Sequence, residues 1–248
     1  SALGLTVVPL NGIPFLTQGT AVTSATLAIA GRVTSVPATA HTDDSYTIEE
    51  WYSDITQSEV YTGMKVGSMA VQLPASGLAT VDFSFMGKDR AQTGTSQYFT
   101  SPAAQGTDGI YAAVNGVMLV NGAPVALVTS ADFSVERALE NATAVGSNSV
   151  ADIFTGRIRV NGNLSVYFQD GVFRDYFDNE TTVSLVLTLT EDNTQGADFI
   201  SFTIPKVKLG SFSKSDGELG ITASTSFVGL LNDVTGSGLA PTTVMIQD

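Results

Sequence analysis

Residues 80–86 read Thr-Val-Asp-Phe-Ser-Phe-Met, so that every second side chain is large and apolar. Successive side chains of a β-strand point to opposite faces of a sheet, which places Val81, Phe83 and Phe85 on one face. Period-2 alternation of this kind is the main sequence signal for a half-buried strand. Further strand-like segments, rich in alternating apolar residues, are 125–135, 163–168, 183–189, 199–209 and 219–230. The sequence therefore predicts a mainly β fold.

One segment, residues 170–179, departs from this alternation. Its apolar residues follow the i, i+1, i+4, i+5 spacing of one helix face: Val172, Phe173, Tyr176 and Phe177. Such a stripe is typical of a short amphipathic helix, and Asp170 is a candidate N-cap residue. We expect a helix over 172–178 that packs this face on the sheet, which makes the chain α+β with β dominant.

Turn residues and strand spacing predict how the strands pair. Asn-Gly dipeptides favour the positive φ values of tight hairpins, and they occur at 115–116, 121–122 and 161–162. We expect residues 65–73 to pair with 78–86, and residues 157–168 to pair with 183–190. Residues 88–110 are rich in Gly, Ser, Thr and Gln, which indicates an extended loop.

Composition excludes several classes of protein. The chain has 248 residues, enough for one large domain or two ordinary ones. With 11 basic and 24 acidic residues its net charge is −13, which argues against a protein that grips nucleic acid through a basic surface. It is 43% hydrophobic and only 14% charged, unlike a disordered acidic segment. No apolar run approaches the roughly 20 residues of a transmembrane helix.

Residues suited to catalysis or metal binding are scarce. There is no cysteine and a single histidine, His41, so thiolate catalysis, disulfides and cysteine-based zinc sites are excluded and a histidine triad is disfavoured. The acidic pairs at 43–44 and 49–50 and the run at 191–193 lack the spacing of a calcium loop, and we interpret them as solvated turns. We predict no catalytic, cofactor-binding or metal-binding residue and no cofactor. A carboxylate pair for glycoside hydrolysis stays open, because such pairs converge only in space.

An internal repeat suggests a duplicated domain. Residues 61–66 (YTGMKV) are similar to residues 202–207 (FTIPKV), which follow 141 positions later. Downstream, 85–87 (FMG) corresponds to 227–229 (FVG). We predict a first domain at 1–90, a linker at 91–110 and a second domain at 111–248. The first domain is expected to be incomplete at its N-terminus, because nothing in it matches the predicted helix.

Eight short segments in a fixed order carry a resemblance to a known family. They are 46–55 (YTIEEWYSDI), 61–66 (YTGMKV), 83–89 (FSFMGKD), 128–137 (VTSADFSVER), 144–148 (AVGSN), 162–168 (GNLSVYF), 176–181 (YFDNET) and 202–208 (FTIPKVK). Over about residues 45–235 the chain resembles the major tail tube proteins of long-tailed (siphovirus-like) bacteriophages. Members of that family have more residues before the first of these segments, so residues 1–4 are expected to end a helix that lies mostly upstream.

The resemblance implies a structural virion protein and no enzymatic activity. It implies two tandem tail-tube-like β-sandwich domains, each with a flanking helix, whose sheets join those of other subunits into a β-barrel ring. Stacked rings would form the hollow tail tube through which phage DNA is ejected. A duplicated chain would form a trimer that gives a pseudo-hexameric ring, with DNA passing an acidic lumen without specific binding.

Partners and location follow from the same resemblance. Besides copies of itself, the chain would contact the tape measure, tail terminator and distal tail proteins, with no membrane partner. It would reside in the virion tail after assembly in the host cytoplasm. The loop at 88–110 would reach a neighbouring subunit or ring. A secreted or surface-attached tandem β-sandwich adhesin or receptor-binding module is the alternative, and it differs in staying monomeric.

The residues expected to serve oligomerisation lie in the predicted barrel strands. They are Lys65, Val66, Val81, Phe83, Phe85, Arg157, Ile158, Leu164, Val166 and Phe168. The expected helix face on the sandwich consists of Val172, Phe173, Tyr176 and Phe177.

Overall fold

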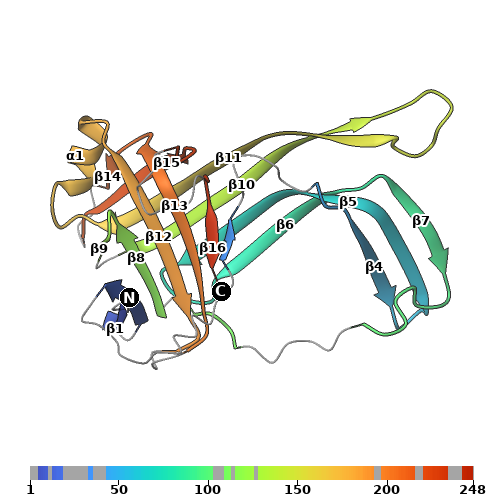
Figure 1. Ribbon diagram of the computed structural model, residues 1–248, viewed down its shortest axis with the longest axis horizontal. Coiled ribbons are helices and arrows are strands. Elements are labelled where there is room, and N and C mark those ends of the chain that lie inside the picture. The colour runs from blue at the N-terminus through green and yellow to red at the C-terminus, as the bar shows by residue number, and fades with distance from the viewer. Residues whose placement is uncertain are drawn as a thin grey trace.

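The computed structural model describes residues 5–10, 13–18, 33–35, 43–102, 109–112, 115–125, 128–192, 197–215, 220–233 and 242–247. This part of the chain is mainly β, as predicted, and contains one helix. The last strands and the helix lie close together, and longer strands extend away from them (Figure 1).

The strands fall into two groups by length. The short strands are β1 (Leu5–Leu10), β2 (Ile13–Gln18), β3 (Val33–Ser35), β4 (Tyr46–Tyr52), β6 (Thr80–Met86), β7 (Asp89–Gly94), β8 (Gly116–Val120), β9 (Ala123–Pro124), β14 (Ser213–Lys214), β15 (Thr222–Gly229) and β16 (Met245–Gln247). The longer strands are β5 (Gln57–Pro74), β10 (Val128–Ala142), β11 (Asp152–Tyr167), β12 (Thr182–Thr190) and β13 (Phe199–Leu209). The helix is α1 (Val172–Asp178).

Fourteen of the strands form one antiparallel sheet that folds over on itself. Its first layer has the order β6-β5-β10-β11-β15, and its second layer continues as β13-β12-β8-β9. The two layers meet where β15 pairs with the end of β13, from Val207↔Gly229 to Leu209↔Phe227. Within the described strands the sheet does not close into a barrel, so the predicted barrel ring is not formed by one chain.

The core lies between the two layers. Phe133, Val160 and Leu164 of the first layer are almost fully buried, as are Leu185 and Ile204 of the second. The rings of Phe133 and Phe202 meet across the layers in an edge-to-face arrangement, 5.2 Å between centroids. Side chains alternate in burial along residues 160–167 of β11 and 182–187 of β12, which explains why the sequence alternates there.

Two long extensions leave the sandwich on the same side (Figure 1). In one, the first half of β5 pairs with β4 and β7 to make a three-stranded arm. In the other, β10 and β11 continue together as a hairpin as far as the pair Ala142↔Asp152. Strand β5 therefore belongs to both the arm and the sandwich.

The helix prediction is confirmed at its bounds and on most of its face. Phe173, Tyr176 and Phe177 pack against the core, whereas Val172 is 41% exposed. Gly171, not the predicted Asp170, occupies the N-cap position. Asp170 still contributes, because its carboxylate accepts the backbone N–H of Val172 at 3.1 Å.

One of the two predicted strand pairs is confirmed and the other is wrong. β5 pairs with β6 from Lys65↔Met86 to Gln72↔Thr80. β11 pairs with β10 and β15, while β12 lies in the other layer between β13 and β8. Both strands alternate apolar residues because both face the same core from opposite sides, and alternation does not distinguish a hydrogen-bonded neighbour from a facing layer.

The Asn-Gly signal was correct at one turn and wrong at another. Asn121 and Gly122 have φ values of 51° and 76° and connect β8 to β9 as a tight turn. Gly162 instead lies inside β11, opposite Phe133. A Cβ on Gly162 would stand 2.3 Å from both the carbonyl oxygen of Asp132 and the ring of Phe227. The glycine there gives room to an aromatic side chain rather than making a turn.

The expected loop at 88–110 begins as a strand, because β5 offers β7 a hydrogen-bonding edge. Each half of the sequence repeat lies in an antiparallel pair, β5–β6 and β13–β15, although their registers differ. Strands from both predicted domains share one sheet through the β5–β10 pairing. The boundaries 1–90, 91–110 and 111–248 stay predictions.

Candidate functional site

The first layer of the sandwich has one apolar face and one polar face. Directly opposed residues of an antiparallel sheet point to the same side, so the strand registers assign every side chain. The polar face contains rows of opposed residues that run across β6, β5, β10, β11 and β15: Thr80, Gln72, Asp132, Asn163 and Ser226; Asp82, Ala70, Ser134, Asn161 and Val228; and Ser84, Ser68, Glu136 and Arg159.

Short polar side chains on this face pair with one another across the strands. The hydroxyls of Ser68 and Ser84 are 2.6 Å apart, and the Asn163 amide donates to the Asp132 carboxylate at 2.9 Å. The charged side chains in these rows are Asp82, Asp132, Glu136 and Arg159, so the face is weakly acidic and rich in hydroxyl and amide groups. Their accessibility shows that no second layer covers this side of the described sheet.

The opposite face of the same layer is apolar and extends farther than the second layer covers. Val71 and Phe133 in its middle are buried, at 0% and 1% exposure. On the outermost strand, β6, the residues on this face are Val81, Phe83 and Phe85, which are 42%, 55% and 41% exposed. Among the described strands β6 pairs only with β5, which leaves its second edge free. A free edge with exposed apolar side chains is a typical protein-association surface.

The structure brings only some of the predicted oligomerisation residues together. Val81, Phe83 and Phe85 lie on one face of β6. On the neighbouring strand β5, Lys65 pairs with Met86 of β6 and Val66 pairs with Phe85. Arg157 and Ile158 are exposed on the β10–β11 hairpin.

The remaining three predicted residues lie elsewhere. Leu164 and Val166 are buried in the sandwich core at 2% and 5% exposure. Phe168 follows β11, packs against that core, and has the Lys214 ammonium 4.5 Å from its ring centroid.

Two acidic pairs predicted to be solvated turns contact other parts of the chain, and the pair at 49–50 lies within β4 and not in a turn. Asp43 forms ion pairs with Lys65 and with Arg137, and the Lys65 ammonium holds the pKa of the Asp43 carboxyl below its usual value. Glu49 accepts the hydroxyl of Ser58 at 2.6 Å and the backbone N–H groups of Tyr98 and Phe99 at 2.7 and 3.0 Å. These donors lower the pKa of Glu49, that of Ser58 most strongly.

The arm carries two tyrosine–carboxylate pairs on the face opposite to that of Glu49. Glu50 and Glu59 stand directly opposite each other on β4 and β5. Their carboxylates accept the hydroxyls of Tyr52 at 3.0 Å and Tyr61 at 2.7 Å. The bond to Glu59 raises the pKa of Tyr61 to about 12. Both tyrosines therefore stay protonated and donate at neutral pH.

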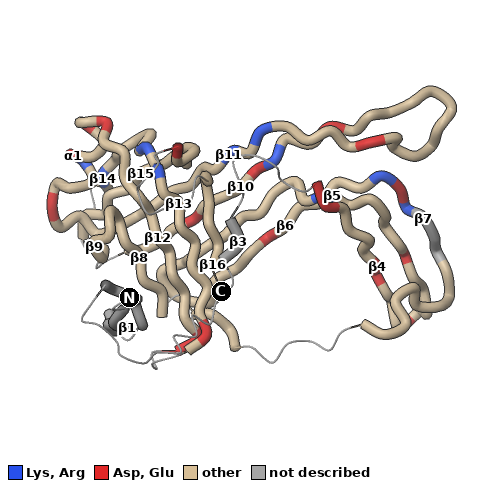
Figure 2. Tube along the Cα trace, viewed as in Figure 1, with Lys and Arg blue, Asp and Glu red and all other residues tan. Residues whose placement is uncertain are grey.

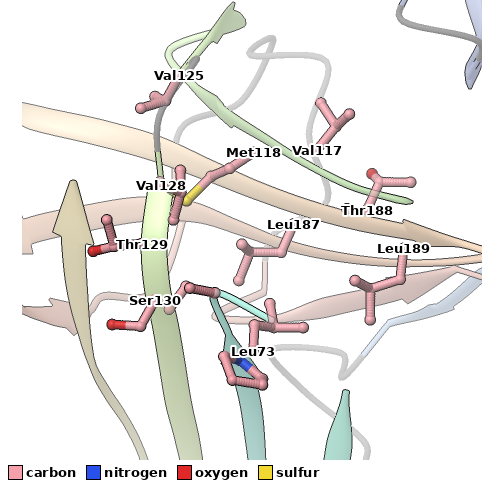
Figure 3. A pocket seen from close by; sticks show the side chains of 14 residues that line it. Leu73, Val117, Met118, Val125, Val128, Thr129, Ser130, Leu187, Thr188 and Leu189 are labelled. Carbon is pink, nitrogen blue, oxygen red and sulfur yellow. The ribbon is translucent and has the colours of Figure 1, made fainter. Parts of the chain in front are cut away.

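A pocket of about 230 Å³ opens between β5, β8, β10 and β12 at one end of the sandwich (Figure 3). Leu73, Met118, Val128, Leu187 and Leu189 point toward it, with the hydroxyl groups of Thr129, Ser130 and Thr188 around them. No ionisable side chain occurs among its described lining residues.

The described residues contain no group of three or more His, Asp or Glu side chains placed to hold a metal ion. In the same part of the chain, no helix has the length and apolar character needed to cross a membrane.

The polar face and the Asp43 ion pairs were missed by the sequence analysis. The face could have been found from the residues that alternate with the apolar positions of 80–86 and 163–168, because most of them are Thr, Asp, Ser and Asn. Nothing in the sequence signals that Asp43 meets Arg137, because 94 positions separate them.

The match to a protein family, given last below, agrees with the resemblance found in the sequence. No curated protein matches the chain. Among solved structures, the anti-feeding prophage cap (AFP tube terminating cap), determined by cryo-EM, shares 12% identity and aligns over 60% of this chain and 98% of its own with a TM-score of 0.41. The sequence matches the phage tail tube protein family over residues 7–243, and the chain therefore belongs to that family.

Proposed function

We propose that copies of this chain assemble into stacked rings that form the hollow tail tube through which phage DNA is ejected. Membership of the tail tube family gives the chain a structural role in the phage tail, and the finer proposal rests on the geometry of the first layer. The observation that carries it is the uncovered polar face formed by β6, β5, β10, β11 and β15. We assign this face to the lumen.

The chemistry of the face suits passing DNA. Phosphate groups bind tightly to clustered lysine and arginine, and the strength falls as those contacts are removed. The polar rows contain three carboxylates and one guanidinium, and their other polar groups are hydroxyls and amides. DNA would meet a hydrated surface without a cationic patch, so it slides without being held.

The free edge of β6 supports contact with a neighbouring copy. An unpaired edge is relieved when a ring closes, because the row of backbone donors and acceptors then finds partners. The apolar side chains Val81, Phe83 and Phe85 would be covered in the same step. We propose three copies per ring, with each chain filling two positions. The repeat supports this number, since each half lies in an antiparallel strand pair.

The absence of cysteine from the sequence makes a labelling experiment direct. Asn163→Cys places a thiol on the polar face, and Asp178→Cys places one on α1 as a matched exposed control. Purified protein is first inspected by negative-stain microscopy for tubes with a central channel. Tubes and monomers are then treated with a small maleimide and with a maleimide carried on a large polyethylene glycol.

We expect Asn163→Cys to react with both reagents in monomers but only with the small reagent in tubes. Asp178→Cys should react with both reagents in both states. Reaction of Asn163→Cys tubes with the large reagent would place the polar face outside and contradict the proposal. Protection from both reagents would place it in a subunit contact, which also contradicts it. A protein that stays monomeric at all concentrations would favour the adhesin alternative.

A further inference from the structure

A charged cluster lies where the arm and the hairpin separate from the sandwich. The cluster consists of Asp43, Lys65 and Arg137, and we call it the Asp43 cluster. On the arm side of this point β5 pairs with β4 and β7, and on the sandwich side it pairs with β6 and β10. The last β5–β10 pair is Ser68↔Glu136, beyond which the two extensions diverge (Figure 1).

Asp43 bridges the two extensions through its two carboxylate oxygens. One oxygen binds the Lys65 ammonium of β5, and the other accepts from Arg137 Nη2 of β10 at 2.9 Å. Lys65 also donates to the carbonyl oxygen of Ile153 on β11 at 2.9 Å. One short segment before β4 thus ties β5, β10 and β11 together. Figure 2 shows acidic and basic residues near the β5 label, in a chain whose charges are otherwise mostly acidic.

The burial of Lys65 makes the cluster depend on Asp43. Lys65 is only 6% exposed, and a buried ammonium is strongly destabilising without a counter-charge. Removing the carboxylate would leave Lys65 with the Ile153 carbonyl alone, beside the like-charged Arg137 that shared the same partner.

A second, more exposed link joins the same two extensions. The Lys88 carbonyl, in the turn between β6 and β7, accepts the backbone N–H of Val150 at 3.0 Å. The Lys88 ammonium pairs with Asp152 at 2.7 Å, with both side chains substantially exposed. Exposed pairs contribute little on their own, so this link follows the position set by the buried one. The Val150 amide is therefore a built-in reporter of whether the two extensions remain in contact.

We propose that Asp43 is a positioning residue that holds the β4–β5–β7 arm in one direction relative to the β10–β11 hairpin. If the chain assembles as proposed above, the fixed arm would present both extensions to a neighbouring copy in a single orientation; this part of the inference rests on the proposed function. The carboxylate acts through Lys65, which it keeps paired, and through Arg137, which it draws toward β5.

The test compares hydrogen–deuterium exchange in monomers of Asp43→Asn and of Asp44→Asn. Asp44 is the adjacent exposed aspartate, so its variant is matched in sequence position and charge change. We expect exchange at residues 62–66 and 150–153 to be at least about tenfold faster in Asp43→Asn, with Asp44→Asn and the core strand β13 unchanged. Equal exchange in the two variants would overturn the proposal.

A double variant separates positioning from simple loss of packing. Asp43→Asn combined with Lys65→Met removes the buried charge together with its partner, and the protection at residues 150–153 should largely return. Failure of this rescue would overturn the proposal. In assembly assays Asp43→Asn should give fewer and less regular tubes than Asp44→Asn, and equal tubes would refute the link to assembly. A wild-type protein that forms no tubes would refute the proposed function but leave the exchange result standing.

Discussion

The exposed apolar edge of β6 gives a quantitative prediction for assembly. Phe83 and Phe85 lie on the same face with their ring centroids 6.3 Å apart, and they are 55% and 41% exposed. A phenylalanine side chain presents about 200 Å² in an unfolded chain, so together they expose roughly 190 Å² of apolar surface. Covering that area would contribute up to about 5 kcal/mol at 25 cal/mol per Å².

The double variant Phe83→Ser, Phe85→Ser removes this contribution from each subunit contact. Because about 1.4 kcal/mol corresponds to a factor of ten, the concentration at which tubes first form should rise by up to about a thousandfold. The fold itself should change little, because surface substitutions away from the core usually alter stability by about 0.5 kcal/mol or less. The melting temperature of the monomer should therefore fall by no more than about 4 °C.

The assay measures the assembly threshold by light scattering and checks the product by negative-stain microscopy. Leu231→Ser serves as the control, because Leu231 is 49% exposed but lies beyond β15, away from the β6 edge. Its threshold should match that of the wild-type protein. A normal threshold in the double phenylalanine variant would refute the assignment of β6 to the subunit contact. A loss of assembly accompanied by unfolding of the monomer would refute the claim that these side chains lie outside the core.

Three further outcomes follow from other parts of the structure. Gly162→Ala should destabilise the monomer by about 2–3 kcal/mol, because its Cβ would stand 2.3 Å from the backbone carbonyl oxygen of Asp132. Gly94→Ala is the control, since no atom lies nearer than 4.0 Å to a Cβ there. Equal denaturation midpoints for the two variants would contradict the close approach at Gly162. Asp82→Lys combined with Asp132→Lys should leave tubes intact but slow genome ejection severalfold, measured on phage carrying the variant, because lysines on the proposed lumen face would bind phosphate. An unchanged ejection rate would argue against assigning that face to the lumen. Lys65 lowers the pKa of Asp43 and Lys88 lowers that of Asp152, so the stabilisation from each pair is present above the pKa of the unfolded state and is lost as pH falls through the pKa of the folded state. The melting temperature, followed by scanning fluorimetry, should therefore hold from pH 7 to 5 and drop below about pH 4. The drop should be smaller in Asp43→Asn.

Features governed by local periodicity were predictable from the sequence. The helix at 172–178 was found because its apolar spacing differs from that of every neighbouring segment, and its bounds match α1. Strand β13 was likewise predicted at its observed limits, because its apolar residues alternate with Ser, Thr and Lys up to both ends. The β-rich fold class follows from the same local pattern.

Features decided by contacts between distant residues were not predictable. The partner of β11 depends on which layer β12 joins, and both choices give the same alternation. Gly162 resembled a turn residue because the Phe227 ring that requires it lies 65 positions away. The polar face was half predictable: the sequence separates two sets of side chains on each strand, but only the position of the second layer tells which set is covered.

The 18 residues of β5 have a mechanical consequence. At about 3.3 Å per residue the strand is roughly 60 Å long, and a single covalent backbone runs from the arm into the sandwich. A pull on the arm along this axis loads the seven β5–β10 residue pairs in shear, so that they bear the force together instead of opening one after another. Tension on the arm is therefore passed to the sandwich through the backbone of β5 itself, and the register shift between Val66 and Ser68 lies on that path.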